Sequence, residues 1–206
     1  MKTISISPSW LRMRRSAAAL LADCRGVAAT EFAVIVPIML VMFFGTVEFS
    51  SGVAVNRKVT LLARTLSDLA SQSISVADSD VTNFFTASGA ILTPYSTAPT
   101  QATLSELYVD PTTHKARVQW SKSATINAAG VVTLATGHAV TSTVTVPAAL
   151  AVDGTYLIFS EVSYLYVPTI GYVMSKTGVT LSDTSFTRPR QSVCVYYSPA
   201  TACTTL

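Results

Sequence analysis

The chain has few charged residues and few histidines. Asp, Glu, Lys and Arg make up 12% of its 206 residues, whereas 50% are hydrophobic, an apolar balance for a soluble domain. The histidines, His114 and His138, lie far apart, and neither has the spacing of a zinc site such as H-E-x-x-H. We therefore expect no metal site and no cofactor.

Motifs of common enzymes are missing as well. The sequence contains no G-x-S-x-G turn, no Walker loop and no C-x-x-C pair. His114 is interpreted as the tip of a hairpin, because a lone imidazole lacks the partners that metal binding or acid–base catalysis needs. These absences predict that the protein is not an enzyme and has no small-molecule substrate.

Basic residues are concentrated at the N-terminus. Before Gly26 the chain carries five Lys or Arg against one Asp, and from Gly26 onward it carries nine Lys or Arg against ten Asp or Glu. The net charge of +3 therefore comes from a leader. This distribution argues against a nucleic-acid-binding face and is typical of a segment that stays in the cytoplasm.

A long apolar run follows this leader. Residues 32–47 contain no charge, and a helix from Val27 to Phe49 would be about 34 Å long, enough to cross about 30 Å of hydrocarbon. Because the basic residues precede it, we expect a cytoplasmic N-terminus and a C-terminal region outside. The predicted organisation is a leader at 1–26, a transmembrane helix at 27–52 and a periplasmic domain at 53–206, with Glu48 and Phe49 at the outer interface.

Helical periodicity continues beyond the apolar run. One helical face carries an apolar stripe with spacings of four and three residues: Val55, Val59, Leu62, Leu66 and Leu69. "SQSIS" ends this helix. A second helix is predicted from Ser79 to Leu92, ended by Pro94. Its predicted buried residues are Val81, Phe84, Phe85 and Ile91.

The rest of the chain shows the alternation of strands. "ATLSELYVD" and "ARVQWSKSA" predict a hairpin, in which Leu104, Leu107 or Tyr108, Val118 and Trp120 compete for the inner face. "GVVTLATG" and "AVTSTVTVP" are weaker strands, Gly154 to Pro168 is the strongest, and a last strand runs from "GVTLSDTSFTRPR" to "SVCVYY". The predicted fold is α+β, with a mainly antiparallel sheet that buries one face against the first helix.

Polar and sulfur side chains predict three tertiary links. Arg64 and Asp68 are spaced for an ion pair on one helix, and Arg188 or Arg190 is placed to pair with Glu161 across adjacent strands. The third link joins Cys194 and Cys203, nine positions apart. Outside the cytoplasm this spacing predicts a disulfide; two independent thiols are the alternative.

The sequence around the start of the apolar run resembles a known class of secreted-filament protein. "RGVAATEFA" (Arg25–Ala33), Pro37 and "GTVEF" (Gly45–Phe49) stand in the register of type IV pilin-like precursors, and more closely of the TadE-like minor pilins or pseudopilins of tight-adherence (Flp) pili. The segments "EVSYLYVP" and "RPR" also resemble that family. Cys24 is a departure, since many relatives carry a charged residue there.

This resemblance implies a fate for the precursor. A prepilin peptidase would cut between Gly26 and Val27, and the product would act with the major pilin, a second minor pilin and the assembly platform in pilus assembly and surface attachment. It would lie in the inner membrane of a bacterium or be extracted into a pilus. The implied fold is pilin-like, with a single-pass membrane helix.

Glu31 has a physical role in this interpretation. Cleavage gives Val27 a charged amine, and Glu31, four residues later on the same helical face, can pair with that amine or with the amine of a neighbouring subunit. An unpaired charge in a bilayer costs about 3 kcal/mol, so pairing favours assembly. In an uncleaved anchor, Glu31 would instead extend to the interface.

Two further questions stay open at this level. Pro37 removes the helix hydrogen bond to the Ala33 carbonyl and should kink the helix, either for flexibility during extraction or as an ordinary transmembrane proline.

The competing function is a periplasmic binding domain or hydrolase held by an uncleaved signal anchor, or secreted after cleavage near Ser51. The N-terminus of the mature protein separates these alternatives.

Overall fold

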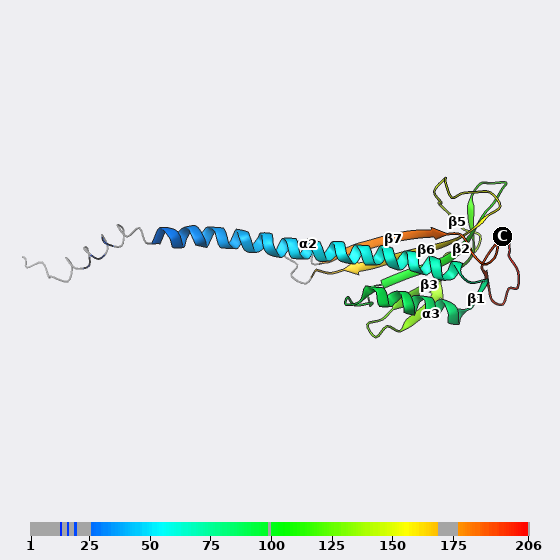
Figure 1. The fold of residues 1–206 in the computed structure, drawn as a ribbon, viewed down its shortest axis with the longest axis horizontal. Coiled ribbons are helices and arrows are strands. Elements are labelled where there is room, and N and C mark those ends of the chain that lie inside the picture. Colours follow the sequence, from blue (N-terminus) through cyan, green and yellow to red (C-terminus); the bar gives the residue numbers. More distant parts are fainter. Residues whose placement is uncertain are drawn as a thin grey trace, which may run out of the picture. The chain divides into compact units, whose positions relative to one another are not determined.

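The structure, a computed structural model, describes Met13, Ser16, Ala19 and residues 26–98, 100–168 and 177–205. The chain divides into two compact units, Met1–Val47 and Glu48–Leu206. The described residues form a long helix, a second helix and a mainly antiparallel sheet (Figure 1). The predicted α+β class is therefore confirmed.

Helix α2 spans Val27–Ser71 and supplies residues to both units. In the second unit, the first four residues of the predicted stripe are fully buried, from Val55 to Leu66. Leu69 is only half-buried, because Ala63 and Ala70 occupy the buried face near the helix end. The helix stops within the "SQSIS" segment that the sequence identified as a break.

Helix α3 spans Asp78–Gly89, and a 3₁₀ turn, η2, follows at Ala90–Leu92. Val81, Phe85 and Leu92 are fully buried, while Phe84 and Ile91 are only half-buried. The predicted burial is therefore confirmed for Val81 and Phe85, whereas Phe84 and Ile91 are less buried than predicted. The buried positions follow spacings of four and three residues through Ser88, and Ile91 falls at the edge of that stripe.

The main sheet has six strands in the order β4-β3-β2-β6-β7, with β5 also paired to β3. All its pairings are antiparallel. The predicted hairpin corresponds to β2 and β3, and the predicted strongest strand to β6. The strand bounds are β2 Thr100–Val109, β3 Ala116–Ile126, β4 Val132–Thr136, β5 Thr143–Val144, β6 Tyr156–Tyr166 and β7 Val179–Thr187.

The C-terminal strand is split, contrary to the prediction of one continuous strand. β7 ends at Thr187, and Tyr196–Tyr197 forms β8, which pairs in parallel with β1 (Ser75–Val76) in a separate two-stranded sheet. Pro189 cannot donate a ladder hydrogen bond. The next residue, Arg190, instead donates its backbone N–H to the Ser71 carbonyl at 2.8 Å, so the chain turns toward the end of α2.

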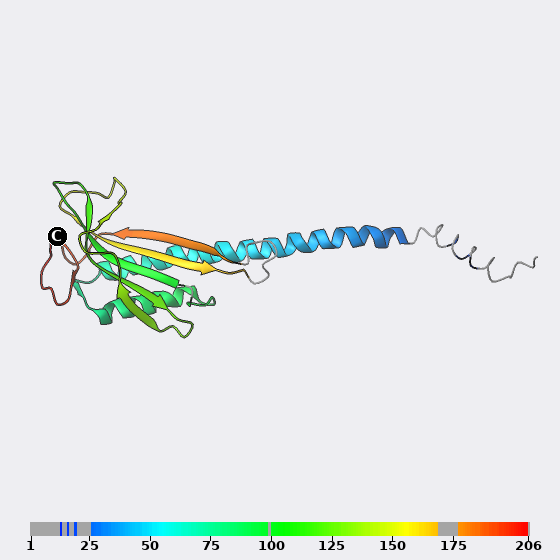
Figure 2. The same ribbon diagram turned by 180° about the vertical axis from the view of Figure 1, so that it is seen from behind.

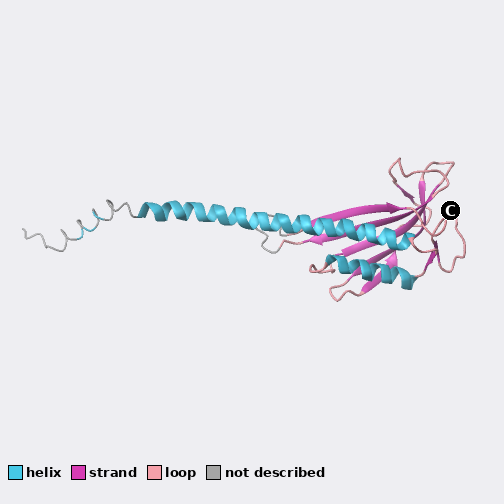
Figure 3. Cartoon of the chain, in the orientation of Figure 1, coloured by secondary structure: helices cyan, strands magenta, loops and turns pink. Residues whose placement is uncertain are grey.

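The sheet buries apolar residues on both faces. Helices α2 and α3 cover one face, where Leu104 and Trp120 pack with residues of both helices; Figure 2 shows the sheet from the opposite side, and Figure 3 distinguishes helices from strands. Leu107 and Val118 belong to a second cluster with Phe159. The predicted inner-face candidates are thus divided between the two faces.

Both predicted ion pairs are wrong. Asp68 pairs with Arg190 rather than Arg64, and the carboxylate of Glu161 contacts His138 rather than an arginine. The turn after β7 explains the first change, because it brings Arg190 to the last turns of α2. The second has a separate reason: Arg188 and Arg190 both lie beyond the end of β7 at Thr187, whereas the cross-strand partner of Glu161 is Thr184.

Candidate membrane anchor and processing site

The first part of α2 is apolar and exposed. By length and composition this helix could cross a membrane, and its most apolar 18-residue window has a mean hydropathy of 2.3 with no residue buried. Large apolar side chains lie on the surface, among them Phe32 and Met42, which are 70% and 68% exposed. Exposure of so many adjacent apolar side chains identifies this segment as a candidate single-pass membrane anchor.

The predicted cleavage point lies at the start of this helix. α2 begins at Val27, Gly26 precedes it, and both residues are exposed. The Thr30 hydroxyl donates to the Val27 carbonyl at 2.8 Å within the first turn. A cut between Gly26 and Val27 would therefore make the first helical residue the N-terminus of the chain. Residues 20–25 lie outside the described residues.

Glu31 and Pro37 both lie on the exposed part of α2. Glu31 is one turn after Val27, in the same helical register that the sequence indicated. Within residues 26–98 the structure shows no ion pair for Glu31. The helix continues through Pro37, although proline cannot donate to the carbonyl of Ala33.

A contact near the N-terminal boundary of the second unit was not predicted. Glu48 is 3% exposed, whereas the sequence placed it at the membrane interface with Phe49. It lies near Tyr166, whose hydroxyl pKa is raised by burial and, to a lesser degree, by the charges of Tyr95 and Glu48. A β-carbon on Gly52 would lie 3.6 Å from the Tyr166 ring.

This contact joins two motifs that are distant in the sequence. Glu48 belongs to "GTVEF", and Gly52 follows that motif. Tyr166 belongs to "EVSYLYVP". Both segments carried the resemblance described above. The resemblance of both segments to one family was the signal in the sequence that linked them. The periodicity of either segment could not indicate that the two meet in space.

The C-terminal segment is attached to the sheet by a disulfide-linked loop. Cys194 and Cys203 form a disulfide with a Cα–Cα distance of 5.8 Å. Val195, next to the buried Cys194, donates its N–H to Glu106 Oε1 at 2.5 Å and accepts from Trp120 Nε1 at 2.6 Å. Burial raises the pKa of Glu106 to about 8, although these hydrogen-bond partners favour the charged form.

The histidines do not form a catalytic or metal-binding arrangement among the described residues. His114 Nδ1 lies 2.9 Å from Asp153 Oδ1 in an exposed pair, at the β2–β3 turn where the sequence placed it, and His138 contacts Glu161. No group of three or more metal-ligating side chains occurs within the part of the chain that the structure describes.

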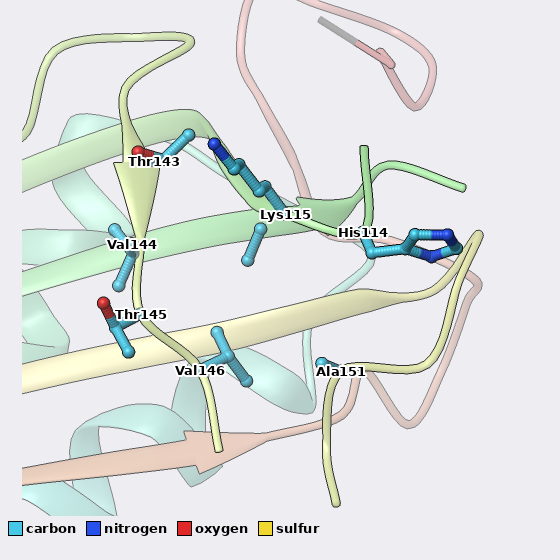
Figure 4. A pocket seen from close by; sticks show the side chains of 8 residues that line it. His114, Lys115, Thr143, Val144, Thr145, Val146 and Ala151 are labelled. Carbon is cyan, nitrogen blue, oxygen red and sulfur yellow. The ribbon is translucent and has the colours of Figure 1, made fainter. Parts of the chain in front are cut away.

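A small pocket next to His114 also lacks such an arrangement. It has a volume of about 280 Å³ and includes residues 143–146 of the β5 region in its lining. Figure 4 shows the imidazole of His114 pointing away from Thr143 and Val144, while Lys115 extends toward Thr143. The lining residues therefore do not direct a base toward a nucleophile.

Comparison with known proteins supports the anchor as the site of interest. Residues 26–66 match the family model of TadE-like proteins. This match confirms, for this segment, the resemblance to TadE-like proteins that the sequence predicted. No curated protein matches the chain, and no solved structure matches it.

Proposed function

We propose that this protein is a minor pilin or pseudopilin of the tight-adherence (Flp) pilus, processed by a prepilin peptidase and acting in pilus assembly and surface attachment. The observation that carries the proposal is the TadE-like match over residues 26–66. The match begins at Gly26, one residue before α2 starts, and covers the whole exposed apolar part of that helix.

Processing explains the charged residue in this apolar segment. The peptidase releases the leader by cutting after Gly26, and Val27 then carries an α-ammonium group at the first position of α2. Glu31 lies one helical turn away and supplies the opposite charge. Pairing between subunits gives the helices a fixed register as they assemble, because an isolated charge is costly in the hydrocarbon.

The proposed orientation of the chain across the membrane is inferred from the charge of the leader and from the disulfide. The basic residues of the leader favour a cytoplasmic N-terminus in the inner membrane of a bacterium. The disulfide between Cys194 and Cys203 is of a kind that persists in an oxidising compartment such as the periplasm. We therefore place residues 53–206 in the periplasm, either held in the membrane complex or extracted into the pilus.

The proposed role is assembly rather than catalysis. The partners are the prepilin peptidase, the major pilin, a second minor pilin and the inner-membrane assembly platform. The exposed apolar face of α2 supports helix–helix association in the membrane, where side-chain packing rather than water exclusion drives contact. Under this proposal the periplasmic unit binds proteins and needs neither a cofactor nor a small-molecule substrate.

The N-terminus of the mature protein tests the proposal. Mass spectrometry of protein from cells that contain an active prepilin peptidase should give Val27 as the first residue, and Gly26→Val should leave the leader attached. Gly45→Val, at another glycine of the same helix, is the matched control and should still be cut. A start at Met1 in the wild type would indicate an uncleaved anchor, and a start near Ser51 a secreted domain.

A further inference from the structure

Strand β7 forms one edge of the main sheet. It pairs with β6 on one side and is the last strand in the order of the sheet, and Figure 1 shows it running along α2. Within residues 26–98, 100–168 and 177–205, no other strand pairs with it. It also contains no proline and no lysine, the residues that commonly protect a free edge from pairing.

Alternate residues of β7 present their backbone groups to this free edge. Thr184 donates its N–H to the side chain of Asp183 at 2.8 Å, so this N–H points away from β6. Backbone groups two residues apart in an antiparallel strand have the same direction. Thr180 and Ser182 therefore also direct their N–H and C=O groups outward, at the spacing that a further strand needs.

A groove follows this edge between β7 and α2. It contains two cavities, of about 450 and 430 Å³, and Asp183, which lies between them in the strand, accepts a hydrogen bond from Thr60 of α2. The strand residues that line the cavities are at alternate positions: Val179, Leu181, Ser185 and Thr187. One face of β7 therefore borders the groove along the strand.

The first cavity is mainly apolar. Phe49 and Val53 of α2, which are 69% and 40% exposed, line it together with Val179 and Leu181. Covering exposed apolar side chains with another apolar group is favourable, because it removes their surface from water. This end of the groove therefore favours an apolar side chain.

Two arginines of α2 supply positive charge along the groove. Arg57 lines the first cavity and Arg64 the second, and both are exposed. Among the residues that the structure describes, neither forms an ion pair. The acids in the groove are engaged within the chain, Asp183 by α2 and Asp68 by Arg190. The groove is therefore complementary to a ligand that carries a carboxylate.

We propose that β7 binds an extended segment of a partner protein as a further antiparallel strand. On the face toward α2, this segment carries a carboxylate beside Arg64 and, four residues later, an apolar side chain in the first cavity. Leu181 and Ser185, which line the two cavities, are themselves four residues apart, or about 13 Å in a strand. Backbone hydrogen bonds give the affinity, and the cavities give the selectivity.

A second copy of this chain is a poorer occupant of the edge. Asp183 is the only charged residue of β7, and its carboxylate is already engaged by Thr60 and by the Thr184 N–H. Two β7 strands paired antiparallel about Asp183 would also place two carboxylates opposite each other, which is destabilising. The β7 strand of another copy therefore supplies no carboxylate to Arg64.

A synthetic peptide tests the proposal on the full-length protein in detergent. The probe is fluorescein-Thr-Glu-Val-Thr-Val-Leu-Thr-amide, whose Glu and Leu lie on one face of a strand. Fluorescence anisotropy should show saturable binding. N-methylation of both valines, whose N–H groups face β7 in the proposed pairing, should weaken binding about ten-fold, whereas N-methylation of Glu and Leu should change it by less than about two-fold.

Variants of the protein locate the site. Ser182→Pro removes one outward N–H and keeps the pairing with β6, so it should weaken binding about ten-fold, whereas Ser182→Ala should bind as the wild type does. Arg64→Ala should weaken binding about three-fold, with no further loss when the peptide carries Gln in place of Glu. Lys115→Ala, at an exposed cation outside the groove, is the matched control.

Four outcomes overturn the proposal. They are no saturable binding of the unmethylated peptide, equal binding of the peptide methylated at its valines, equal binding by Ser182→Pro, and a peptide-free dimer that Ser182→Pro dissociates, which would assign the edge to a second copy. Circular dichroism shows whether Ser182→Pro is folded, and the methylated peptides test the pairing on the wild type. None of these measurements depends on cleavage after Gly26, so failure here is distinct from failure of the proposed function.

Discussion

Glu106 accepts a 2.5 Å hydrogen bond from the backbone N–H of Val195, 89 residues later in the chain. Trp120, the cross-strand neighbour of Glu106, donates to the carbonyl of the same residue. Two side chains of the β2–β3 hairpin therefore satisfy both backbone groups of Val195. Since Cys194 precedes this residue, these two hydrogen bonds fix the start of the disulfide loop to the sheet.

The buried carboxyl of Glu106 should make the stability of the second unit dependent on pH. Its pKa is raised by burial from an ordinary 4.5 to about 8, so the folded state binds more protons than the unfolded state between these values. The free energy of unfolding should therefore fall as pH rises from about 4.5 to about 8, by a total on the order of 5 kcal/mol.

Glu106→Gln tests this dependence, because the amide oxygen can still accept from Val195. Denaturant unfolding of the full chain in detergent, followed by tryptophan fluorescence, should give a smaller pH slope for this variant and higher stability than the wild type above neutral pH. Asp183→Asn, at a half-exposed aspartate of the same sheet, is the control. Equal slopes for wild type and Glu106→Gln would contradict the prediction.

The disulfide should stabilise the second unit. Cys194 and Cys203 close a loop with a sequence separation of nine, and loop-closure entropy predicts a loss of about 2–3 kcal/mol in the free energy of unfolding when both become serine. A reductant should lower the stability of the wild type by a similar amount and leave the double serine variant unchanged. Alkylation of both thiols in protein taken directly from the membrane would show that the disulfide is not formed in the cell.

Tyr166 should be a major determinant of the stability of the second unit. It is 7% exposed, and its ring packs next to Gly52, so Tyr166→Ala should cost about 3–5 kcal/mol in the free energy of unfolding. Tyr166→Phe removes only the hydroxyl hydrogen bond with Ser51 and should cost about 1 kcal/mol.

Leu165→Ala is the matched control for Tyr166. Its side chain is exposed on the preceding position of β6, and its removal should change the free energy of unfolding by less than about 0.5 kcal/mol. A denaturation curve for Tyr166→Ala that overlays the control would show that the Gly52 contact contributes little.

Periodicity predicted most of the regular structure. The spacing of Val55, Val59 and Leu62 identified the buried face of α2, and alternation identified β6 as the strongest strand. These features depend on residues within one helix or strand, so the local sequence pattern is enough to predict them. The same reasoning located the apolar anchor, because it is a contiguous segment, whereas the candidate processing site was implied by the resemblance to TadE-like proteins.

Features that depend on tertiary contacts were not predictable in this way. A register shift between Glu106 and Leu107 changes the cross-strand partners in the hairpin, and alternation alone does not predict such a shift. The buried role of Glu106 depends on Val195, which is brought near only when β7 ends and the chain turns at Arg190. A glutamate in an alternating strand would ordinarily be assigned to the solvent.

The pairing of Glu31 with a processed N-terminus gives the sharpest test of the proposed assembly. Glu31→Gln removes the charge and keeps the side-chain size, so membrane insertion and cleavage after Gly26 should be unchanged. Cross-linking to other pilins should fall about ten-fold, because the charge on the Val27 amine is then uncompensated. Thr30→Ala, in the same helical turn, should assemble normally.

A double variant separates this pairing from a general role of Glu31. In a chain kept uncleaved by Gly26→Val, the Val27 amine does not exist, so replacing Glu31 should produce no further loss of cross-linking. The two substitutions are then non-additive because they remove the two partners of one interaction. Independent losses from the two changes would place the effect of Glu31 outside the amine pair, and wild-type assembly by Glu31→Gln alone would remove the pairing altogether.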